Sequence, residues 1–235
     1  MTLPLPHLTA LLLSYGCVGA LLLATELLRR AGKMTPDTAR KIVHVGVGLW
    51  VVPTILVFAD WRVAIVPPLT FMVANYVIHR FRLSPLDSDP ANLGTVFFPF
   101  SFAVLLAVFF RPGEPGNQAF LAVAGLLTMA LGDAAAAVFG KRYGTRRYTI
   151  LGHSRTMEGS MAMFLVTGVL IAAVLGAMED YSWHPAVAFG LVTGTAAAGI
   201  EAVCPFGSDN LFVPLGTAAI LWALVEVSGA ALGVI

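Results

Sequence analysis

Eight long apolar stretches, separated by short polar segments, constrain the fold of this chain more than any other feature of its sequence. They cover roughly residues 8–28, 38–59, 62–79, 95–110, 118–139, 157–178, 185–204 and 211–233. A helix needs about 20 predominantly apolar residues to cross the hydrocarbon core of a bilayer. The second stretch has a charged start and the fourth is short, so the count is seven to eight. We therefore expect an all-α integral membrane protein with its transmembrane helices in one bundle.

The composition supports a single membrane domain over residues 1–235. The chain is 58% hydrophobic and 11% charged, whereas soluble domains are roughly 45–50% apolar and about 25% charged. A net charge of +1 gives no indication of nucleic-acid binding. Cys17 and Cys204 have no metal-ligand spacing, so we expect them to be packing residues. The first apolar run precedes any positive charge, which favours a retained first span over a cleaved signal peptide.

The basic residues predict the orientation of the helices. Most Lys and Arg residues follow the first, third and fifth stretches, while Arg62 and Arg111 fall on the opposite side. The residues on the basic side are Arg29, Arg30, Lys33, Arg40, Lys41, Arg80, Arg82, Lys141, Arg142, Arg146, Arg147 and Arg155. Since cytoplasmic loops carry the excess of Lys and Arg, we expect these loops to be cytosolic and both termini to lie outside.

Asp133 lies near the cytosolic end of the fifth stretch, followed by the alanines 134–137 and by Gly140. An ionised side chain at the centre of a membrane helix costs at least about 2.5–3.5 kcal/mol, so even near the interface this carboxylate needs a metal, a cation or water. It is either a salt-bridged or snorkelling acid or a ligand of a divalent metal. The small residues favour a metal ligand, because they let helices or a ligand approach the backbone closely.

The segment from Gly140 to Ser160 combines glycines with cations. Gly140 and Gly144 allow tight backbone turns. Arginine can hold a phosphate through two hydrogen bonds, and the N-terminus of the helix opened by Glu158-Gly159-Ser160 suits an anion. Five cations would face phosphate oxygens: Lys141, Arg142, Arg146, Arg147 and Arg155. A basic loop can also be a topology signal or contact anionic lipids, but the flanking acids Asp133 and Glu158 favour a phosphate site.

Two further polar elements lie on the same side. The segment 201–214 holds Glu201, Asp209 and Asn210 without a balancing cation. This composition suits a magnesium ion shared with nucleotide phosphates, or simple capping of the last helix. Arg40 and Lys41 are spaced to share one helical face with His44, which favours a role of these three side chains towards substrate or phosphate.

Taken in order, these elements resemble the family of CTP-dependent membrane lipid kinases, which includes dolichol kinase, phytol kinase and the CTP-using diacylglycerol kinase of yeast. The family pattern RKxxH matches residues 40–44, and GDxxAxxxGxxxG matches 132–144. KTxEGS corresponds to 155–160, with Arg155 in place of lysine, and an acid followed by DNxxxP corresponds to Glu201 and 209–214. The retained charge at Arg155 leaves the reaction plausible but changes the geometry of a tight phosphate contact.

The resemblance implies Mg²⁺-dependent transfer of the γ-phosphate of CTP to the hydroxyl of a membrane lipid alcohol at the cytosolic face. Phytol, polyprenols or dolichol, and diacylglycerol are the candidate acceptors. On this interpretation Asp133, Asp209 and Glu158 form the catalytic and metal-binding set. Either Asp209 or Asp133 accepts the proton of the alcohol. The remaining implied contacts to nucleotide, phosphate or substrate are Gly140, Lys141, Arg142, Gly144, Arg146, Arg147, Arg155, Thr156, Gly159, Ser160, Asn210, Arg40, Lys41, His44 and Glu201.

Two other functions fit parts of the pattern. Phosphatidate cytidylyltransferases share a similar GD…KTxEG block and also use CTP and magnesium, but their later Lys-Arg and Lys-Asp signature is absent, since nothing after Arg155 is basic. A non-enzymatic lipid carrier would explain the spans and not the convergence of charged motifs on one side. The oligomeric state stays open, because glycines at 168, 176, 190 and 194 could serve helix packing within or between subunits.

Overall fold

The computed structural model describes residues 4–83, 92–178 and 182–232 and is mainly helical. The first helices in chain order are α1 (His7–Arg30), α2 (Pro36–Leu49), α3 (Val51–Val57), α4 (Trp61–Ala64), α5 (Val66–Arg80) and α6 (Gly94–Phe109). They are followed by α7 (Ala119–Leu127), the π-helical turn η1 (Thr128–Gly132), α8 (Asp133–Tyr143), α9 (Met157–Gly176), α10 (Trp183–Val203) and α11 (Asp209–Leu232). An antiparallel hairpin of β1 (Arg147–Ile150) and β2 (His153–Thr156) joins α8 to α9.

The helical segments confirm the predicted multi-pass membrane fold. Within the described residues, seven segments are long and apolar enough to cross a membrane: 7–30, 36–57, 61–80, 119–143, 157–176, 183–203 and 209–229. The apolar helix α6 has only 16 residues. Seven of the eight predicted stretches correspond to these seven segments, and the predicted fourth stretch corresponds to α6. In three of the segments one span is formed by consecutive elements: α2 with α3, α4 with α5, and α7 with η1 and α8.

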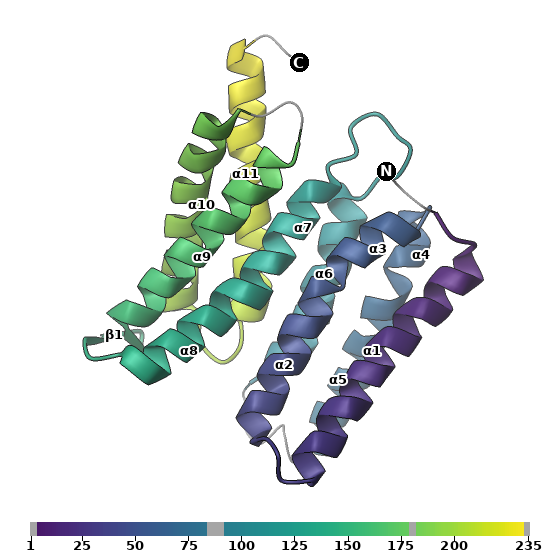
Figure 1. Ribbon diagram of the computed structural model, residues 1–235, viewed down its shortest axis with the longest axis vertical. Coiled ribbons are helices and arrows are strands. Elements are labelled where there is room, and N and C mark those ends of the chain that lie inside the picture. Colours follow the sequence, from purple (N-terminus) through teal and green to yellow (C-terminus); the bar gives the residue numbers. More distant parts are fainter. Residues whose placement is uncertain (1–3, 84–91, 179–181, 233–235) are drawn as a thin grey trace.

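The helices form two flanks with α6 and α7 between them (Figure 1). On one flank α9 packs along α10, and α10 packs against α11. On the other flank α1 packs against α2, and α5 packs against α6. The α1–α2 connection, the hairpin and the α10–α11 connection all lie at the same end of the bundle, which is the lower end in Figure 1. The predicted basic loops and the acidic segment at 201–214 therefore meet at one end.

Glycines allow α9 and α10 to approach each other closely. A Cβ atom at Gly194 would lie 2.7 Å from the carbonyl oxygen of Phe164, and one at Gly190 would collide with the carbonyl oxygen of Gly168. Small residues at such crossings are typical of helix pairs in membranes, where packing replaces the hydrophobic driving force. Of the two uses left open by the sequence, Gly168, Gly190 and Gly194 thus serve packing within the chain.

Two prolines inside helices free backbone carbonyls that side chains of neighbouring helices then bind. A proline has no N–H for the carbonyl four residues earlier, so Pro99 in α6 leaves the carbonyl of Thr95 without its helical partner. Asn75 of α5 donates its Nδ2–H to that oxygen at 2.7 Å. Pro214 in α11 similarly frees the carbonyl of Asn210. The hydroxyl of Ser101 in α6 lies 3.0 Å from that oxygen and 2.8 Å from the carbonyl oxygen of Phe98, so the two oxygens share its proton. These bonds tie α5 to α6 and α6 to α11.

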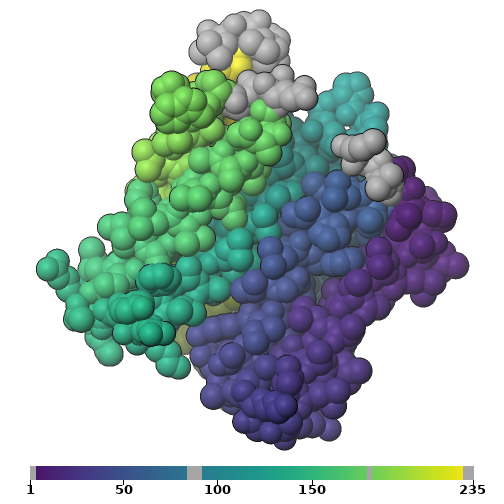
Figure 2. All heavy atoms as spheres, in the orientation of Figure 1, coloured from purple at the N-terminus to yellow at the C-terminus, as the bar shows by residue number. Residues whose placement is uncertain are grey.

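The outer surface of the bundle is apolar, as expected of a surface that faces lipid. On α1 the side chains of Leu8, Leu12 and Leu23 are 61–68% exposed. The interior core includes Leu121, Leu126 and other residues of α6, α7 and α9. Figure 2 shows α1 (purple) lying along α2 (blue) on the right-hand side of this view.

Candidate functional site

A cavity of about 880 Å³ lies between the two flanks and brings together charged side chains from distant parts of the sequence. Its volume is within the range of roughly 300–1,000 Å³ that is usual for small-molecule sites. The cavity is lined by α1, α2, α5, α6, α8, β2 and the start of α11. The predicted site residues that line it are Arg40, Lys41, His44, Asp133, Arg155, Asp209 and Asn210.

Asp133 is positioned by a local change in helix geometry. It is the first residue of α8, directly after the π-helical turn η1. Such turns within α-helices are frequent at functional sites. Gly132 before it has no room for a side chain, because a Cβ atom there would lie 2.6 Å from the Sδ of Met163. Asp133 lines the cavity, and no described residue forms a hydrogen bond or ion pair with its carboxylate. A half-buried carboxylate in this state has both oxygens available to a ligand.

Asp209 and Asn210 begin α11 at the same end of the cavity. The backbone N–H and the side-chain amide of Asn210 both donate to Asp209 Oδ1, at 3.0 and 3.3 Å. The amide of Asn210 also donates to the carbonyl oxygen of Gly207 at 3.3 Å. The bond from Ser101 to the freed carbonyl of Asn210 fixes this turn against α6. Asp209 is therefore held rigidly through one oxygen while its Oδ2 atom stays available.

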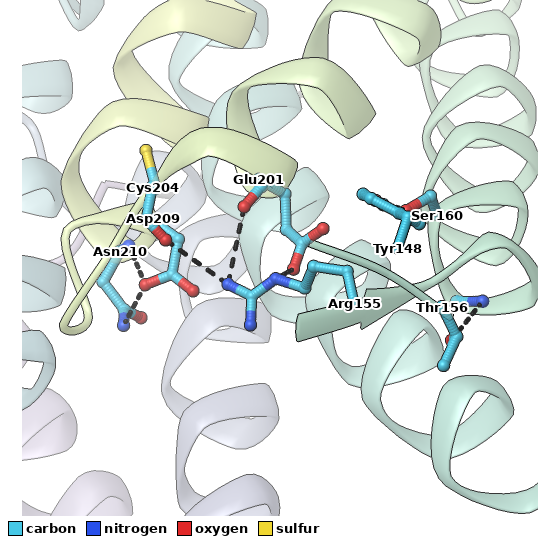
Figure 3. Close-up of polar contacts among 9 residues, drawn as sticks. Tyr148, Arg155, Thr156, Ser160, Glu201, Cys204, Asp209 and Asn210 are labelled. Atoms are coloured by element: carbon cyan, nitrogen blue, oxygen red, sulfur yellow. Dashed lines mark hydrogen bonds and ion pairs between the residues drawn. The ribbon is translucent and has the colours of Figure 1, made fainter. Parts of the chain in front are cut away.

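Arg155 reaches from β2 to the far side of the cavity. Its Nε lies 2.8 Å from Oε1 of Glu201, which is 6% exposed. Its Nη2 donates to the carbonyl oxygens of Cys204 and Glu201, at 3.3 and 3.5 Å. Figure 3 shows the guanidinium directed between Glu201 on α10 and Asp209 at the start of α11. Glu201 therefore balances Arg155, and the arginine anchors the hairpin to the C-terminal end of α10.

The predicted polar face of α2 points into the cavity. The Nζ of Lys41 lies 2.9 Å from Asp37 Oδ2, and Arg40 forms a longer ion pair of 3.5 Å with Asp37. The His44 ring packs on Phe98 with 4.2 Å between ring centroids. Its Nε2 atom is buried and has no hydrogen-bond partner within the described chain. The ring itself lines the cavity, whereas this nitrogen is a buried polar atom that still lacks a partner.

Glu158 lies outside the cavity lining and has partners of its own. One of its carboxylate oxygens, Oε1, accepts hydrogen bonds from the hydroxyl and N–H of Thr145, at 2.6 and 3.1 Å, and from the N–H of Arg146 at 3.2 Å. Glu158 thus closes the loop between α8 and the hairpin. The structure does not place it with Asp133 and Asp209, so its predicted role at a metal has no geometric support here.

The predicted glycines have a packing explanation. A Cβ atom at Gly140 or Gly159 would lie 2.8 or 2.9 Å from Oγ1 of Thr156, and Gly144 is equally close to that side chain. Thr156 caps α9 by accepting a hydrogen bond from the N–H of Gly159 at 3.1 Å. The glycines let α8 and the start of α9 close around this threonine. That N–H is consequently engaged within the chain rather than open to an anion.

The remaining predicted residues lie around the hairpin. Ser160 shares a short hydrogen bond with the hydroxyl of Tyr148, which joins β1 to α9. The four other cations are exposed at the end of the bundle beside the cavity: Lys141, Arg142, Arg146 and Arg147. Among them Lys141 comes within 3.8 Å of Asp37 on α2, so the end of α8 lies close to the charged rim of the cavity.

Sequence reasoning missed several polar residues of the cavity. Asn75, Asn92 and His153 line it, and His153 packs edge-on against Phe206 with ring centroids 5.0 Å apart. Asn75 could have been found as a lone amide inside an apolar span, since such groups need a partner in the membrane. Cys204 is buried beside this region, and burial raises the pKa of its thiol. This favours the packing role predicted for it.

The carboxylates of the cavity are candidate ligands of a magnesium ion. Among the described residues, no group of three or more His, Cys, Asp or Glu side chains is close enough to hold a metal ion by itself. Mg²⁺ in nucleotide-binding sites usually takes one or two carboxylates, with phosphate and water completing the octahedron. Asp133 and Asp209 line one cavity, and each keeps a free carboxylate oxygen. This donor set fits magnesium bound together with a phosphate.

Comparisons with known proteins give the family. The chain is 35% identical over 231 residues to a phytol kinase of Synechocystis, covering 95% of this chain and 94% of that protein. It is 26% identical to a dolichol kinase of Arabidopsis thaliana and 24% identical to the dolichol kinase of Saccharomyces cerevisiae. These matches cover 79% and 76% of this chain, and 35% of each relative. No protein-family model matches the chain, and no solved structure matches it.

The fold and the comparisons together define a multi-pass membrane protein of the lipid-kinase class, with a charged cavity near one end of the helices. The chain belongs to the family of phytol and dolichol kinases.

Proposed function

We propose that this protein transfers the γ-phosphate of CTP to the hydroxyl of a membrane lipid alcohol, with Mg²⁺, at the cytosolic face of the membrane. The observation that carries the proposal is the 35% identity to a phytol kinase over nearly the full length of both chains. Phytol is accordingly the first acceptor to test, followed by polyprenols. The charged cavity supports the proposal, because phosphoryl transfer depends on positioning and on neutralising phosphate charge.

Asp133 and Asp209 are the residues that would hold magnesium, which supplies charge neutralisation at the phosphates when bound. Arg155 lines the same cavity and would contact phosphate oxygens with its remaining N–H groups. Lys41 and Arg40 face the cavity from α2 and add positive charge opposite Asp133. The exposed cations of the α8–hairpin region would attract the nucleotide from solution, since exposed charges act mainly on encounter.

The reaction itself requires one proton acceptor. Asp209 would take the proton of the alcohol, as its Oδ1 is held by Asn210 and its other oxygen is unengaged; Asp133 is the alternative. The alcohol oxygen then forms a bond to the γ-phosphorus while the bond from that phosphorus to the β–γ bridging oxygen breaks, and CDP leaves. His44 lines the same cavity and would lie beside the acceptor hydroxyl or a phosphate oxygen.

The decisive experiment follows the phosphorus atoms. Purified protein in detergent would be incubated with phytol, geranylgeraniol, a longer polyprenol or phosphatidate, and with CTP labelled in parallel tubes at the γ- or α-position. Label from the γ-position in the lipid supports the kinase. Label only from the α-position, with phosphatidate as acceptor, would identify a cytidylyltransferase instead. Lipid binding without transfer of either label would favour a carrier.

The position of the site relative to the membrane needs a separate test. The proposal places the charged end of the bundle in the cytosol because most Lys and Arg residues lie there. CTP added to sealed inverted vesicles should then support phosphorylation without detergent. Activity only in right-side-out vesicles would reverse the proposed orientation.

A further inference from the structure

The cavity changes from polar to apolar along its length. On α1 the lining runs from Glu26 and Thr25 at the charged end to Leu22 and Val18. On α2 it runs from Arg40 to Val43 and Val47, away from the same end. These positions are spaced by three or four residues, so each helix turns one continuous face to the cavity.

The other wall shows the same change. From Asn92, just before α6, the lining runs along α6 through Thr95 to Phe98, and on α5 Phe71 lies farthest from the charged end. The apolar part is therefore continuous with the part that holds Asp133 and Asp209. An apolar wall offers no hydrogen bonds to water, whereas burying a hydrocarbon against it is favourable by about 25 cal/mol per Å² of apolar surface.

The apolar part ends near Val18, the lining residue of α1 farthest from the charged end. One turn beyond it, the hydroxyl of Tyr15 on α1 shares a 2.8 Å hydrogen bond with Thr70 Oγ1 on α5. The Tyr15 ring also packs against Phe71, with centroids 5.9 Å apart. These contacts join α1 to α5 next to the apolar part. From Leu22 to Val18 the apolar face of α1 rises only about 6 Å, so the wall covers the first isoprene units of an extended chain and not a long tail.

The cavity lies beside the less tightly packed side of α1. On one side α1 packs along α2, as Figure 2 shows, and it packs less extensively against α5. Leu22 lines the cavity and is 38% exposed, an area that includes the surface it turns to the cavity. A ligand tail longer than the apolar part of the cavity has its route into the surrounding lipid between α1 and α5.

We propose that the wall formed by Val18, Leu22, Val43, Val47 and Phe71 binds the hydroxyl-proximal isoprene units of the acceptor, and that the rest of its tail lies in the bilayer. This inference rests on the proposed lipid-kinase function and adds the specificity rule of the site. The enzyme selects the first units of the alcohol and is indifferent to tail length beyond them. A tail confined within the protein would instead give a sharp length optimum.

An acceptor series measures this rule. Prenyl alcohols of increasing length, from geraniol to long polyprenols, would be compared at saturating CTP in detergent micelles. We expect kcat/KM to rise until the wall is filled and then to stay constant for longer alcohols. A maximum at one length, with loss of activity for longer chains, would overturn the proposal.

A pair of adjacent variants tests the wall itself. Leu22→Trp fills the apolar part of the cavity, whereas Leu23→Trp places the same side chain at a lipid-facing position that is 61% exposed and does not line the cavity. We expect Leu22→Trp to raise KM for geranylgeraniol by at least about tenfold, with KM for CTP unchanged and Leu23→Trp at the wild-type level. Equal effects of the two variants, or an unchanged KM for the alcohol in Leu22→Trp, would contradict the proposal.

A binding measurement on the wild-type protein separates this inference from the proposed function and needs no variant. An isoprenoid alcohol carrying a photoreactive diazirine in its second isoprene unit would be cross-linked without nucleotide, and the labelled peptides mapped. Labelling of α1, α2 and α5 supports the wall even if no phosphate is transferred. Labelling confined to α9–α11 would refute it even if the kinase activity is confirmed.

Discussion

The freed carbonyl of Asn210 gives the sharpest test of how this fold is held together. Pro214 cannot donate to that oxygen, and the hydroxyl of Ser101 lies 3.0 Å from it and 2.8 Å from the carbonyl oxygen of Phe98, so the two oxygens share its single proton. Ser101 is fully buried, with 0% exposure. Ser101→Ala removes the donor and leaves a buried carbonyl without a partner, which costs about 1–3 kcal/mol. We expect the free energy of unfolding to fall by that amount.

A second substitution tells whether the unpaired carbonyl is the cause. Pro214→Ala restores an N–H at the position from which a helix bonds the carbonyl of Asn210. In that background Ser101→Ala should cost no more than about 0.5 kcal/mol, because the oxygen keeps a partner. The double-mutant cycle cancels the separate effect of Pro214→Ala on helix propensity, so the difference between the two costs isolates the proposed hydrogen bond.

The assay is reversible unfolding in mixed micelles of increasing SDS fraction, followed by circular dichroism. Ser228→Ala is the matched control. The Ser228 hydroxyl donates to the carbonyl of Val225 within α11 at 2.9 Å and no proline frees that carbonyl, so its loss should change stability only slightly. The same loss for Ser101→Ala in both backgrounds would show that Pro214 plays no part and would refute the reasoning.

Three further outcomes follow from the site. Asp133→Asn should lower kcat by a factor of about 10²–10³ or more while the protein stays folded, measured as γ-label transfer alongside circular dichroism; near-normal turnover would remove Asp133 from the site. Arg155→Ala should destabilise the protein by about 3–5 kcal/mol because it strands the buried Glu201, and adding Glu201→Leu should recover much of that loss in the SDS titration. Gly159→Ala should cost about 1–3 kcal/mol through overpacking against backbone, whereas Gly19→Ala, with open space around it, should be neutral.

The spans could be predicted from sequence because lipid imposes a length and a composition on each crossing helix. The hairpin at 147–156 could not. Its strands have four residues each, and its turn places Leu151 and Gly152 at φ 50° and 83°, so a leucine stands where asparagine or glycine would signal such a turn. The π-helical turn before Asp133 likewise leaves no pattern in the apolar run that contains it.

The sequence predicts which charged residues belong to the site, but it does not predict the hydrogen bonds and ion pairs that they form. Asp133, Asp209, Arg155 and Lys41 do line one cavity, because their segments all end on the same side of the membrane. Nothing in the sequence pattern indicates that Glu158 accepts hydrogen bonds from the α8–hairpin loop. Adjacent cations and acids in a sequence show the side on which they lie, whereas a hydrogen bond depends on how the intervening loop turns.

The helix-breaking prolines also explain why polar groups can line a cavity inside an apolar bundle. A lone asparagine in a membrane helix requires a partner, and Asn75 finds one in the carbonyl of Thr95 that Pro99 has freed. That bond uses the amide N–H and leaves the Oδ1 atom of Asn75 without a partner among the described residues. Asn75 lines the cavity between its charged and apolar parts, at the level at which the hydroxyl of an alcohol would enter. Asn75→Leu should therefore both weaken the α5–α6 contact and raise KM for the alcohol. Asn75→Asp, which retains the oxygen and loses the donor, should separate the two effects when stability and kinetics are measured on the same preparations.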